Sequence, residues 1–476
     1  MEPDFELPLT LPPPGSGLLR SFHSQLHAAI LDGRLRPGTR MPSTRTLAGM
    51  YGVSRNTALA AYDLLLAEGY LEARPRGGTF VARAVPRALP KPPATPAAGE
   101  DRRLNAFWRN PPAIDGHRSL PAPPEVDFRL GAPDESALRF DIWQRLSARA
   151  MRSIAREGGG HADPRGRAAL REAVAKHVSF TRAVACGPDD LVVTAGTQQA
   201  LDLLARILVT PGKTVVAVED PGYPPVRAVF AAAGARVVPV PVDEQGIVVE
   251  RIPADAKVVY VTPSHQFPLG CVMSMARRAA LLAFARENGA VILEDDYDGE
   301  FRFGERPLDA LQTMDRSQSV FYLGTFSKSL FPALRLGFVA APGWALAALA
   351  SAKQCADGHC PQPTQDALAA FIHEGHLARH VRKMREVYGQ RRQHLLALID
   401  EHFNGLLAPV ASSAGLHLAA FSSASLDVAM LAAYARIAGV GIYSLAPYYA
   451  APQGKAGLAF GYGATSLDAI SSGMAR

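Results

Sequence analysis

Cysteine is scarce in this sequence, and long apolar segments are missing from it. Four cysteines among 476 residues are too few for a disulfide framework. No uncharged apolar run reaches the roughly 18 residues of a membrane-spanning helix, and the first residues, MEPDFELPL, are acidic where a secretory signal peptide is basic. These absences argue against a disulfide-stabilised secreted protein and against a membrane protein. We therefore expect a globular cytoplasmic protein.

Two of the cysteines flank a histidine in the segment CADGHC, which ends at Cys360. Sulfur and imidazole are zinc ligands, but Cys355 and Cys360 do not have the spacing of a common zinc site, and no second pair of ligands follows. We therefore predict a plain loop here and no metal ion. Cys186 and Cys271 are expected to be small buried hydrophobic side chains.

Lysine is missing from the stretch between Arg20 and Arg83, although this stretch is basic. It contains nine arginines and four acidic residues, a surplus of five positive charges in a chain whose formal net charge is +6. Most of the positive charge is thus concentrated in one small N-terminal unit. Such a concentration is expected of a module that binds phosphates, although a solvated basic surface would have the same composition.

The composition changes twice along the chain, which is longer than one ordinary domain. Residues 1–83 form a first unit. Residues 84–125 are dense in proline and alanine, which predicts a semi-extended linker. From residue 126 to residue 476, Val- and Ile-rich strands alternate with helical segments, which predicts an α/β domain with a mostly parallel sheet. We expect strands at residues 191–196, 214–220, 257–262, 290–296 and 319–325.

Three helices are predicted in the first unit. The first covers residues 16–32, and Ser43 caps the second, TRTLAGMY. Ser54 caps the third helix, and we expect its buried side to be formed by Leu59, Tyr62 and Leu66.

The polar residues in the first turn of the third helix then point outward, as in a helix that enters the major groove of DNA. Arg55 can bond guanine in a bidentate manner, Asn56 can contact adenine, and Thr57 suits a phosphate. The candidate DNA-binding residues of the helices are Ser43, Arg45, Ser54, Arg55, Asn56 and Thr57.

A β-hairpin is predicted after the third helix. Residues 69–74 form its first strand, residues 76–79 its turn, and residues 80–81 the returning strand. Its arginines would lie along the phosphate backbone, and the candidates in this wing are Arg74, Arg76, Gly77, Gly78 and Thr79. Residues 37–81 resemble the winged helix-turn-helix domains of the GntR family, which implies binding to double-stranded operator DNA. A small helical domain that does not meet DNA is the alternative.

A second set of motifs provides what a protein needs to hold pyridoxal 5'-phosphate. This cofactor requires a lysine for a Schiff base, a carboxylate at its pyridine nitrogen, donors for its phosphate and a flat side chain over its ring. Lys328, in GTFSKSLFPALRLG, is the candidate catalytic lysine. Tyr223, in EDPGYPP, follows a predicted strand and is placed to stack on the ring.

Donors for the phosphate are expected from two segments. Arg335 follows the lysine by seven residues and is always charged. A strand-to-helix turn elsewhere offers backbone N–H groups and the positive end of a helix dipole. We expect the phosphate to be bound by Thr325, Ser327 and Arg335 from the first segment and by Gly196, Thr197 and Gln198 from the second.

The segment VILEDDYDGEF contains the candidate carboxylates. In a strand, Asp295 and Tyr297 point to one face and Asp296 to the other. Asp295 would then hold the pyridine nitrogen and Tyr297 would bond the ring hydroxyl. Asp296 takes the place of Asp295 if the strand ends one residue earlier.

From about residue 127 to the C-terminus, the chain resembles aminotransferases of fold type I. The segments that carry this resemblance are VTAGTQQAL, EDPGY, TPSHQFPLG, EDDYDGEF and GTFSKSLFPALRLG. Together with the winged helix, they resemble the MocR/GabR-type regulators of the GntR superfamily over nearly the whole chain. The resemblance implies a head-to-tail, domain-swapped homodimer that holds pyridoxal phosphate. It also implies a small-molecule effector and control of genes, commonly those of amino-compound or vitamin B6 metabolism.

Two departures from the aminotransferase pattern concern the ligand. The loop SHQFPLG lacks the asparagine that contacts the ring hydroxyl in those enzymes, and Phe267 stands at its position. We assign the contact to His265, with a structural loop residue as the alternative. No arginine occurs between Arg436 and Arg476, and Lys455 cannot bind a carboxylate in a bidentate manner.

A third departure lies at Tyr223, which two prolines follow, so the arginine that a GABA-sensing relative has there is missing and Arg227 is the nearest one. We interpret Arg227 as a solvated residue of the following helix. A GABA-like effector is therefore not expected, whereas another amine or pyridoxal phosphate itself fits.

The hypothesis that best fits both halves is a transcription regulator that senses an effector through the Schiff base. An amine would displace Lys328, shift the conformations of the cofactor domain and change the spacing of the two winged helices. An active aminotransferase with an appended DNA-binding domain is the alternative, and would need a clamp for the substrate carboxylate. A domain that serves only dimerisation would have no use for Lys328 and Arg335, and both are present.

Overall fold

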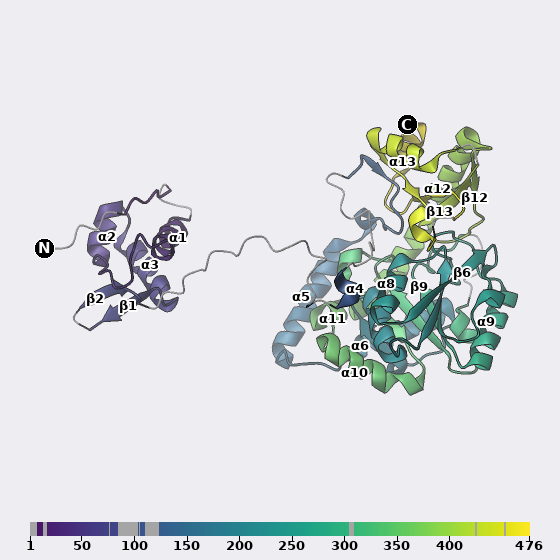
Figure 1. The fold of residues 1–476 in the computed structure, drawn as a ribbon, viewed down its shortest axis with the longest axis horizontal. Helices are drawn as coiled ribbons and strands as arrows, with labels where there is room; N and C mark the ends of the chain where they lie inside the picture. The colour runs from purple at the N-terminus through teal and green to yellow at the C-terminus, as the bar shows by residue number, and fades with distance from the viewer. Residues whose placement is uncertain are drawn as a thin grey trace. The chain divides into compact units, whose positions relative to one another are not determined.

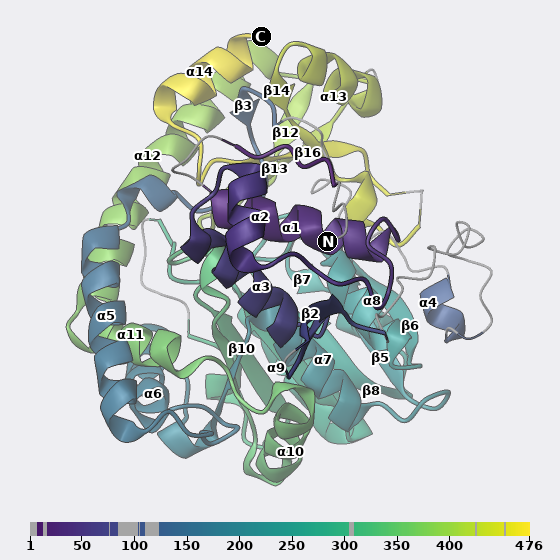
Figure 2. The same ribbon diagram turned by 90° about the vertical axis from the view of Figure 1, so that its left-hand side faces the viewer.

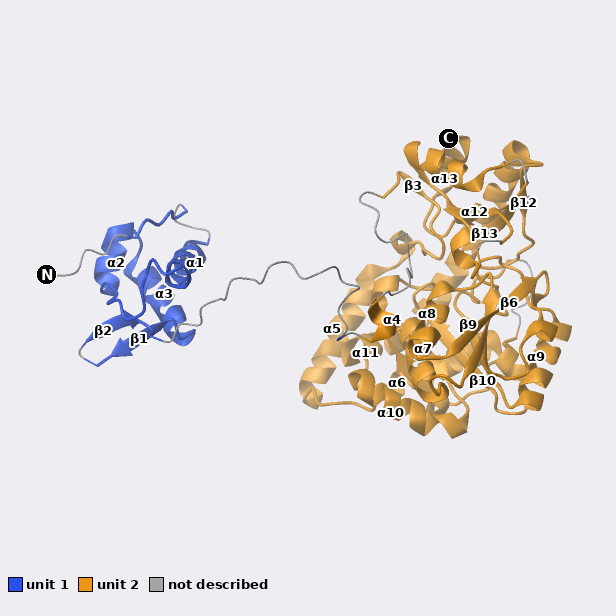
Figure 3. Cartoon of the chain, in the orientation of Figure 1, with its two compact units in different colours: residues 1–103 blue, residues 104–476 orange. Residues whose placement is uncertain are grey.

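The computed structural model describes residues 7–12, 17–75, 77–83, 103, 105–109, 123–303, 309–423, 426–451 and 454–476. They belong to two compact units, Met1–Arg103 and Leu104–Arg476 (Figure 3). The boundary between the units falls inside the segment predicted to be a linker. Of that segment, only residues 103, 105–109 and 123–125 are described, and they include the short helix α4 (Ala106–Arg109). None of the helices in the described residues is long and apolar enough to cross a membrane.

The first unit consists of three helices and a hairpin, α1 (Leu18–Leu31), α2 (Thr44–Tyr51), α3 (Arg55–Ala67), β1 (Leu71–Arg74) and β2 (Gly78–Val81) (Figure 1). Ser43 Oγ accepts a hydrogen bond from the N–H of Thr46 at 3.1 Å, and Ser54 Oγ accepts one from the N–H of Thr57 at 3.0 Å. These bonds satisfy N–H groups that have no partner within the helix. Both helices therefore begin where the capping serines predict.

The buried side of α3 differs from the prediction. Ala58, Ala61, Tyr62 and Leu65 are buried at the spacing of one helix face, whereas 47% of Leu59 is exposed. The helix packs against both α1 and α2. Such close packing favours small side chains at the contact. The prediction was correct for Tyr62 and wrong for Leu59, because it followed the large leucines instead of the alanines.

The hairpin is tighter than predicted. β1 and β2 pair antiparallel from Leu71 opposite Val81 to Arg74 opposite Gly78, so the turn precedes Gly78. Gly78 and Thr79 therefore belong to the returning strand and not to the turn, and Arg76 lies outside the described residues. Met41 N–H donates to Thr79 O at 2.8 Å, which adds the segment before α2 to the same small sheet.

The second unit is built on an eight-stranded sheet in the order β4–β11–β10–β9–β8–β5–β6–β7. Neighbouring strands are parallel from β10 to β6 and antiparallel at both edges. This confirms the predicted α/β class with a mostly parallel sheet. The strands are β4 (Leu191–Thr194), β5 (Val215–Asp220), β6 (Arg236–Asp243), β7 (Gly246–Ile247), β8 (Ala256–Val261), β9 (Val291–Asp296), β10 (Val320–Thr325) and β11 (Gly337–Ala340).

Helices cover both faces of this sheet, because its strands are apolar on both sides. Val216 and Val218 pack with α7 (Thr197–Leu208) and α8 (Pro224–Ala232). Val215 and Ala217 pack with α9 (Met275–Asn288) on the opposite face. Figure 1 shows the strands between these two layers. The other long helices of this region are α5 (Phe140–Glu157), α6 (Ala168–Arg182), α10 (Leu346–Asp357) and α11 (Gln362–His373).

A smaller sheet forms a second lobe of the same unit, and Figure 2 shows its C-terminal elements gathered at one end. Its strand order is β12–β13–β16–β15. The chain enters this lobe early, because β3 (Val126–Asp127) pairs with β14 (Val440–Gly441). The remaining elements are α12 (His376–Phe403), β12 (Leu407–Pro409), β13 (His417–Ser422), α13 (Val428–Ile437), β15 (Tyr443–Ser444), β16 (Gly457–Gly461) and α14 (Leu467–Ala475).

Candidate functional site

Lys328 lies in the turn after β10, and its amine contacts a segment far away in the chain. Lys328 Nζ donates to the carbonyl oxygen of Gly131 at 2.7 Å, across 197 residues of sequence. Gly131 has a φ of 67°, and a Cβ on it would lie 2.6 Å from Nζ. A side chain at this position would displace the lysine amine and would adopt a backbone conformation that favours glycine, so glycine suits this position.

Arg335 and the first turn of α7 form a region suited to an anion. Arg335 Nη2 donates to the carbonyl oxygen of Ala195 at 2.6 Å, and a Cβ on Gly196 would lie 3.1 Å from the same nitrogen. The guanidinium therefore lies beside the N-terminal end of α7, where backbone N–H groups and the helix dipole also attract negative charge. Thr197 Oγ1, in the same turn, is buried and has no hydrogen-bond partner among the described residues.

Three other predicted phosphate donors lie close to these residues in the sequence, at the end of β10, in the turn after it and in the first turn of α7. Thr325 and Ser327 are buried and bonded to each other, since Thr325 Oγ1 donates to Ser327 Oγ at 3.1 Å. Because the Ser327 oxygen accepts this bond, its own hydroxyl proton can be donated elsewhere. Gln198 is the second residue of α7, so its backbone N–H is one of those that have no acceptor within the helix.

Asp295 is buried at the end of β9. Its Oδ2 accepts a hydrogen bond from the Tyr260 hydroxyl at 2.7 Å, whereas its Oδ1 has no hydrogen-bond partner among the described residues. Burial raises the pKa of Asp295 to about 7, and the Tyr260 hydrogen bond and the nearby Lys328 charge work against that rise. A buried carboxylate with one oxygen uncommitted is suited to a cationic N–H donor.

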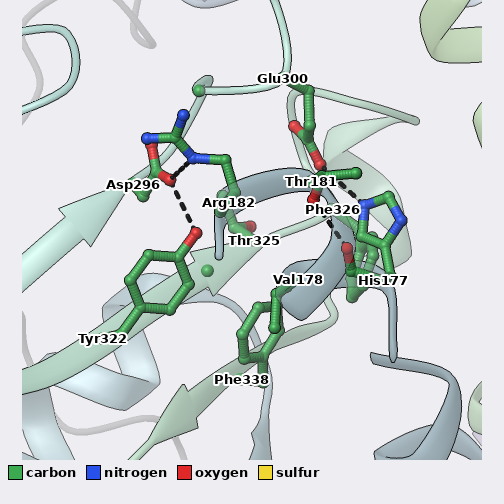
Figure 4. Close-up of a pocket in the computed structure, with 12 residues that line it drawn as sticks. His177, Val178, Thr181, Arg182, Asp296, Glu300, Tyr322, Thr325, Phe326 and Phe338 are labelled. Carbon is green, nitrogen blue, oxygen red and sulfur yellow. Dashed lines mark hydrogen bonds and ion pairs between the residues drawn. The ribbon is translucent and has the colours of Figure 1, made fainter. Parts of the chain in front are cut away.

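Asp296 points to the opposite face of β9, as the alternation of a strand requires. Arg182 Nε donates to Asp296 Oδ2 at 2.6 Å, and the Tyr322 hydroxyl donates to the same oxygen at 2.7 Å (Figure 4). The Arg182 charge is thus compensated within the interior. These residues line a cavity of about 20 Å³, which has room for one water molecule.

Tyr297 follows β9, and its hydroxyl lies 2.9 Å from Nδ1 of His265. The same nitrogen lies 2.9 Å from Asp298 Oδ2. Burial and the Asp298 charge hold the pKa of Tyr297 well above its ordinary value, so the phenol stays protonated. His265 is therefore in hydrogen-bond contact with Tyr297 and Asp298, the two residues that directly follow β9.

Phe267 lies at the centre of an aromatic group that includes Tyr223. The ring centroids of Phe267 and Tyr223 are 5.6 Å apart, and those of Phe267 and Tyr297 are 5.8 Å apart, both with nearly perpendicular planes. Tyr448 lies at a similar distance on another side. The loop that lacks the asparagine thus has an aromatic ring at that position, packed between the two tyrosines expected to contact the cofactor.

These residues fit pyridoxal phosphate on structural grounds. Asp295 Oδ1 and Thr197 Oγ1 are buried polar atoms that need a partner, and none of the described residues provides one. The guanidinium, the N-terminal turn of α7 and the serine hydroxyl supply donors for a phosphate. Lys328 supplies the amine.

Several residues around this site were missed by the sequence analysis. Tyr260 supports Asp295, and Gly131 accepts the lysine bond. Glu219 is buried at the end of β5, where it accepts hydrogen bonds from the hydroxyl of Thr262 at 2.6 Å and from Gln266. Of these residues, only Glu219 could have been recognised from the sequence, because it is an acid near the end of a strand whose other residues up to that point are apolar.

Arg227 is not solvated as predicted. Its Nη1 donates to the carbonyl oxygen of Tyr448 at 2.8 Å, and it ties α8 to the smaller lobe. Lys455 lies 3.9 Å from the centroid of the Phe421 ring. Both cations therefore have partners in the same chain.

The cysteines of CADGHC have separate surroundings. Cys360 is buried and lies 3.3 Å from Lys353 Nζ, whereas Cys355 is exposed. Cys271 is buried as predicted, while Cys186 is only partly buried. Within the part of the chain that the structure describes, the only group of three side chains placed to share a metal ion is His265, Asp298 and His417.

The predicted DNA-contacting residues of the first unit fall into two groups. Arg45, Arg55 and Asn56 are exposed, whereas Ser43 and Ser54 are engaged as caps. The hydroxyl of Thr57 lies 2.8 Å from Ser54 Oγ. The side chains of Arg55 and Asn56 are therefore exposed in the first turn of α3, and Ser54 caps this end of the helix.

In the wing, Arg74 is held by its neighbours. Its Nε donates to Glu72 Oε1 at 3.0 Å, and its guanidinium lies 4.4 Å from the centroid of the Phe80 ring. Gly77 precedes β2, and Gly78 and Thr79 begin it. Arg40, whose side chain lies beside Gly78, is a basic residue of this surface that the sequence analysis did not single out.

Models of two protein families match the chain. Residues 22–81 match the bacterial regulatory proteins of the gntR family, and residues 135–450 match aminotransferase class I and II. The first match covers the winged helix, and the second covers the main sheet with most of the smaller lobe.

Two curated relatives match along nearly the whole chain. The probable rhizopine catabolism regulatory protein MocR of Rhizobium meliloti is 37% identical over 466 residues, which are 96% of this chain and 92% of that protein. The HTH-type pyridoxine biosynthesis transcriptional regulator PdxR of Corynebacterium glutamicum is 30% identical over 466 residues, which are 98% and 96% of the two chains.

Among solved structures, the kynurenine aminotransferase of Pyrococcus horikoshii, determined in complex with PMP, is similar with a TM-score of 0.68 and 26% identity. The match covers 73% of this chain and 88% of that enzyme. These two relatives over nearly the full length are regulators, whereas this structural relative of the larger part is an enzyme.

Proposed function

Since the chain belongs to the MocR-type transcription regulators of the GntR family, which bind pyridoxal phosphate, we propose that its second unit senses an effector at the cofactor and thereby controls operator binding. The domain division that we propose is 1–83 for DNA binding, 84–125 for the linker and 126–476 for the effector domain. A regulator of this kind acts where the DNA is, in the cytoplasm.

The surroundings of the residues support the roles that we propose for them. Lys328 holds the cofactor covalently, and Arg335 with the first turn of α7 binds its phosphate. Tyr297 bonds the ring hydroxyl, and Tyr223 covers the ring. Bound pyridoxal phosphate supplies an electrophilic carbon that reacts with amines.

Asp295, and not Asp296, is the residue that we assign to the pyridine nitrogen. The observation that carries this assignment is the buried Oδ1 of Asp295, which has no partner among the described residues, on the side of β9 that meets the Lys328 charge. Asp296 is already bonded to both Arg182 and Tyr322. Asp296 Oδ1 likewise has no partner among the described residues, but the Arg182 guanidinium already balances the charge of that carboxylate. A second cation on that face would therefore be left without a counter-charge.

The first unit contacts DNA through α3 and the wing. Arg55 and Asn56 are exposed at the N-terminal end of a helix whose opposite face is buried, which suits contact with base edges in the major groove. Arg74 lies on the hairpin and Arg40 lies beside it, and both suit phosphate contacts. Two such units in a homodimer would bind two half-sites.

The effector is an amine or pyridoxal phosphate itself. The C-terminal Arg476 donates to Glu125, and Arg227 and Lys455 have the partners described above. These cations are therefore poorly suited to clamp a carboxylate, which disfavours an amino-acid substrate and the rival function of an active aminotransferase.

A spectrum of the full chain tests the proposal. Purified protein with pyridoxal phosphate should absorb near ~420 nm, and borohydride should trap the cofactor on Lys328. Lys328→Ala should lose trapping and the response to effector but keep its affinity for operator DNA, while Lys213→Ala, an exposed lysine elsewhere, should behave as wild type. Absence of the band in wild type would refute the sensing site. A steady amino-group transfer over many turnovers would favour the enzyme instead.

A further inference from the structure

Two histidines and an acid are buried together beside Tyr297. No more than 1% of His265, Asp298 or His417 is exposed, and their nitrogen and oxygen atoms lie within 4.8 Å of one another. They come from the loop after β8, the turn after β9 and the start of β13. A Cβ on Gly415 would collide with the His265 ring and lie 2.7 Å from Asp298 Oδ2. The surrounding backbone is therefore shaped around this cluster.

The hydrogen bonds fix where the protons lie. The Asp298 carboxylate can only accept, so the His265 nitrogen that lies 2.9 Å from it, Nδ1, carries the hydrogen. Tyr297 O lies 2.9 Å from this same Nδ1–H, so it too accepts from His265. The phenol proton of Tyr297 cannot then be given to His265 and must point elsewhere.

His417 supports the same arrangement from the other side. Its Nε2 lies 3.1 Å from the carbonyl oxygen of Pro268, which can only accept, so Nε2 carries the hydrogen. Burial and the adjacent His265 hold the pKa of His417 well below its ordinary value, so it is a neutral ring. The ring centroids of the two histidines are 4.8 Å apart, and a neutral His417 adds no charge beside His265.

We propose that Asp298 and His265 are positioning residues that direct the Tyr297 hydroxyl proton toward the ring oxygen of the bound cofactor. The inference rests on the proposed function, because it needs pyridoxal phosphate at Lys328. It also changes the predicted role of His265, which acts through Tyr297 and does not touch the cofactor.

The expected consequence is a change in the colour of the bound cofactor with pH. A hydrogen bond donated by Tyr297 stabilises negative charge on the ring oxygen, which then holds the proton shared with the Lys328 nitrogen less strongly. The pH midpoint of the absorbance change is therefore lower with the bond than without it. Other titratable groups that influence Tyr297 are Asp295, Glu219 and Tyr462, and they stay unchanged in the comparison.

The experiment is a pH titration of the absorbance near ~420 nm on the full chain loaded with pyridoxal phosphate. We expect Tyr297→Phe to raise the midpoint by roughly one pH unit and Asp298→Asn to raise it in the same direction. In the Tyr297→Phe background, Asp298→Asn should add nothing, because its effect needs the hydroxyl. Glu294→Gln is the control, since Glu294 is a buried acid of β9 whose carboxylate accepts hydrogen bonds from the backbone N–H groups of residues 311 and 312.

A second pair of variants covers the case in which Asp298→Asn does not fold. His265→Asn keeps an N–H donor near the position of Nδ1 and should keep the midpoint close to wild type, whereas His265→Leu should raise it. An unchanged midpoint in Asp298→Asn and His265→Leu, or an equal shift of Asp298→Asn with and without the Tyr297 hydroxyl, overturns the inference. If wild type has no band at all, the proposed cofactor site has failed and not this inference alone.

Discussion

The two units of this protein use polar side chains in opposite ways. In the DNA-binding unit, Arg55 and Asn56 are exposed, and their positions depend on a cap only one or two residues away. In the cofactor unit, Asp295, His265 and Asp298 are buried, and the partners of these side chains lie 33 or 35 residues away in the sequence.

The difference follows from the ligands. Operator DNA is large, and a protein binds it through an exposed surface. The side chains of that surface stay hydrated until the complex with DNA forms. A small cofactor is enclosed, so the groups that hold it lose their hydration when the protein folds and must be satisfied by the ligand or by each other. The second unit should therefore respond to the charge state of its interior, and the first to the loss of single exposed groups.

The largest effect should come from a buried acid. Burial raises the pKa of Glu219 to about 7 from an ordinary value of 4.5. Its protonated form is thus favoured in the folded state, so the stabilisation is fully present below pH 4.5 and is lost as the pH rises through about 7. The loss is on the order of 3 kcal/mol at most. The melting temperature of Glu219→Gln relative to wild type should therefore rise from pH 5 to pH 8 in cofactor-free protein. A constant difference would contradict the shift.

Removal of the phosphate-binding cation should have the next largest effect. Arg335→Ala should weaken binding of pyridoxal phosphate by roughly 2 to 3 kcal/mol, because a charge-assisted hydrogen bond is lost. Arg335→Lys should lose less, since it keeps the charge without the planar fork. Cofactor titration by fluorescence or absorbance measures both. Arg206→Ala, a surface arginine of α7 that pairs with Asp202, serves as the control and should bind normally.

Loss of one exposed arginine should test the DNA-binding unit. Arg55→Ala should weaken specific operator binding by roughly 1 to 3 kcal/mol with little effect on stability or on the cofactor spectrum. Arg34→Ala removes an equal charge from an arginine that pairs with Asp32 after α1, and should cost much less. Gel-shift titrations at one fixed salt concentration compare the two. Equal losses would mean that only the total charge matters.

The smallest effect is expected from the helix cap. Ser54→Ala should destabilise the N-terminal end of α3 by about 1 kcal/mol, and Ser54→Asn should restore most of it. Hydrogen exchange of residues 55–67 in the full chain measures this change directly. Faster exchange in both variants would show that the side-chain oxygen is not the cap.

The same contrast explains what could be predicted. Ser43 and Ser54 determine helix starts through contacts three residues away, so local sequence was sufficient for α2 and α3. Strand alternation likewise placed Asp295 and Asp296 on opposite faces. The contact of Lys328 with Gly131 spans 197 residues, and that of His417 with Pro268 spans 149, so no local pattern indicates them.

Some predictions were wrong because tertiary packing determines which side chains are buried. The hairpin turn was also predicted too long, since Gly78 already belongs to the returning strand. Leu59 is exposed because α3 approaches its neighbours through Ala58 and Ala61. The prediction that Arg227 is solvated is wrong because its acceptors, the carbonyl oxygens of residues 447 and 448, lie in the C-terminal lobe and far away in the sequence. Both errors concern contacts between segments that are far apart in the sequence, which local sequence patterns do not indicate.

The bond from Lys328 to Gly131 makes the reactive amine part of a tether. Gly131 follows a segment in which Val126 and Phe128 are bonded to the smaller lobe, and this segment continues the chain that arrives from the DNA-binding unit. When the amine is used for the cofactor, the Gly131 carbonyl loses its donor and the tether loses one of its anchors. Equilibria that share one group are reciprocal, so whatever strengthens the bond of the Lys328 amine to the Gly131 carbonyl must weaken the attachment of that amine to a ligand by the same factor.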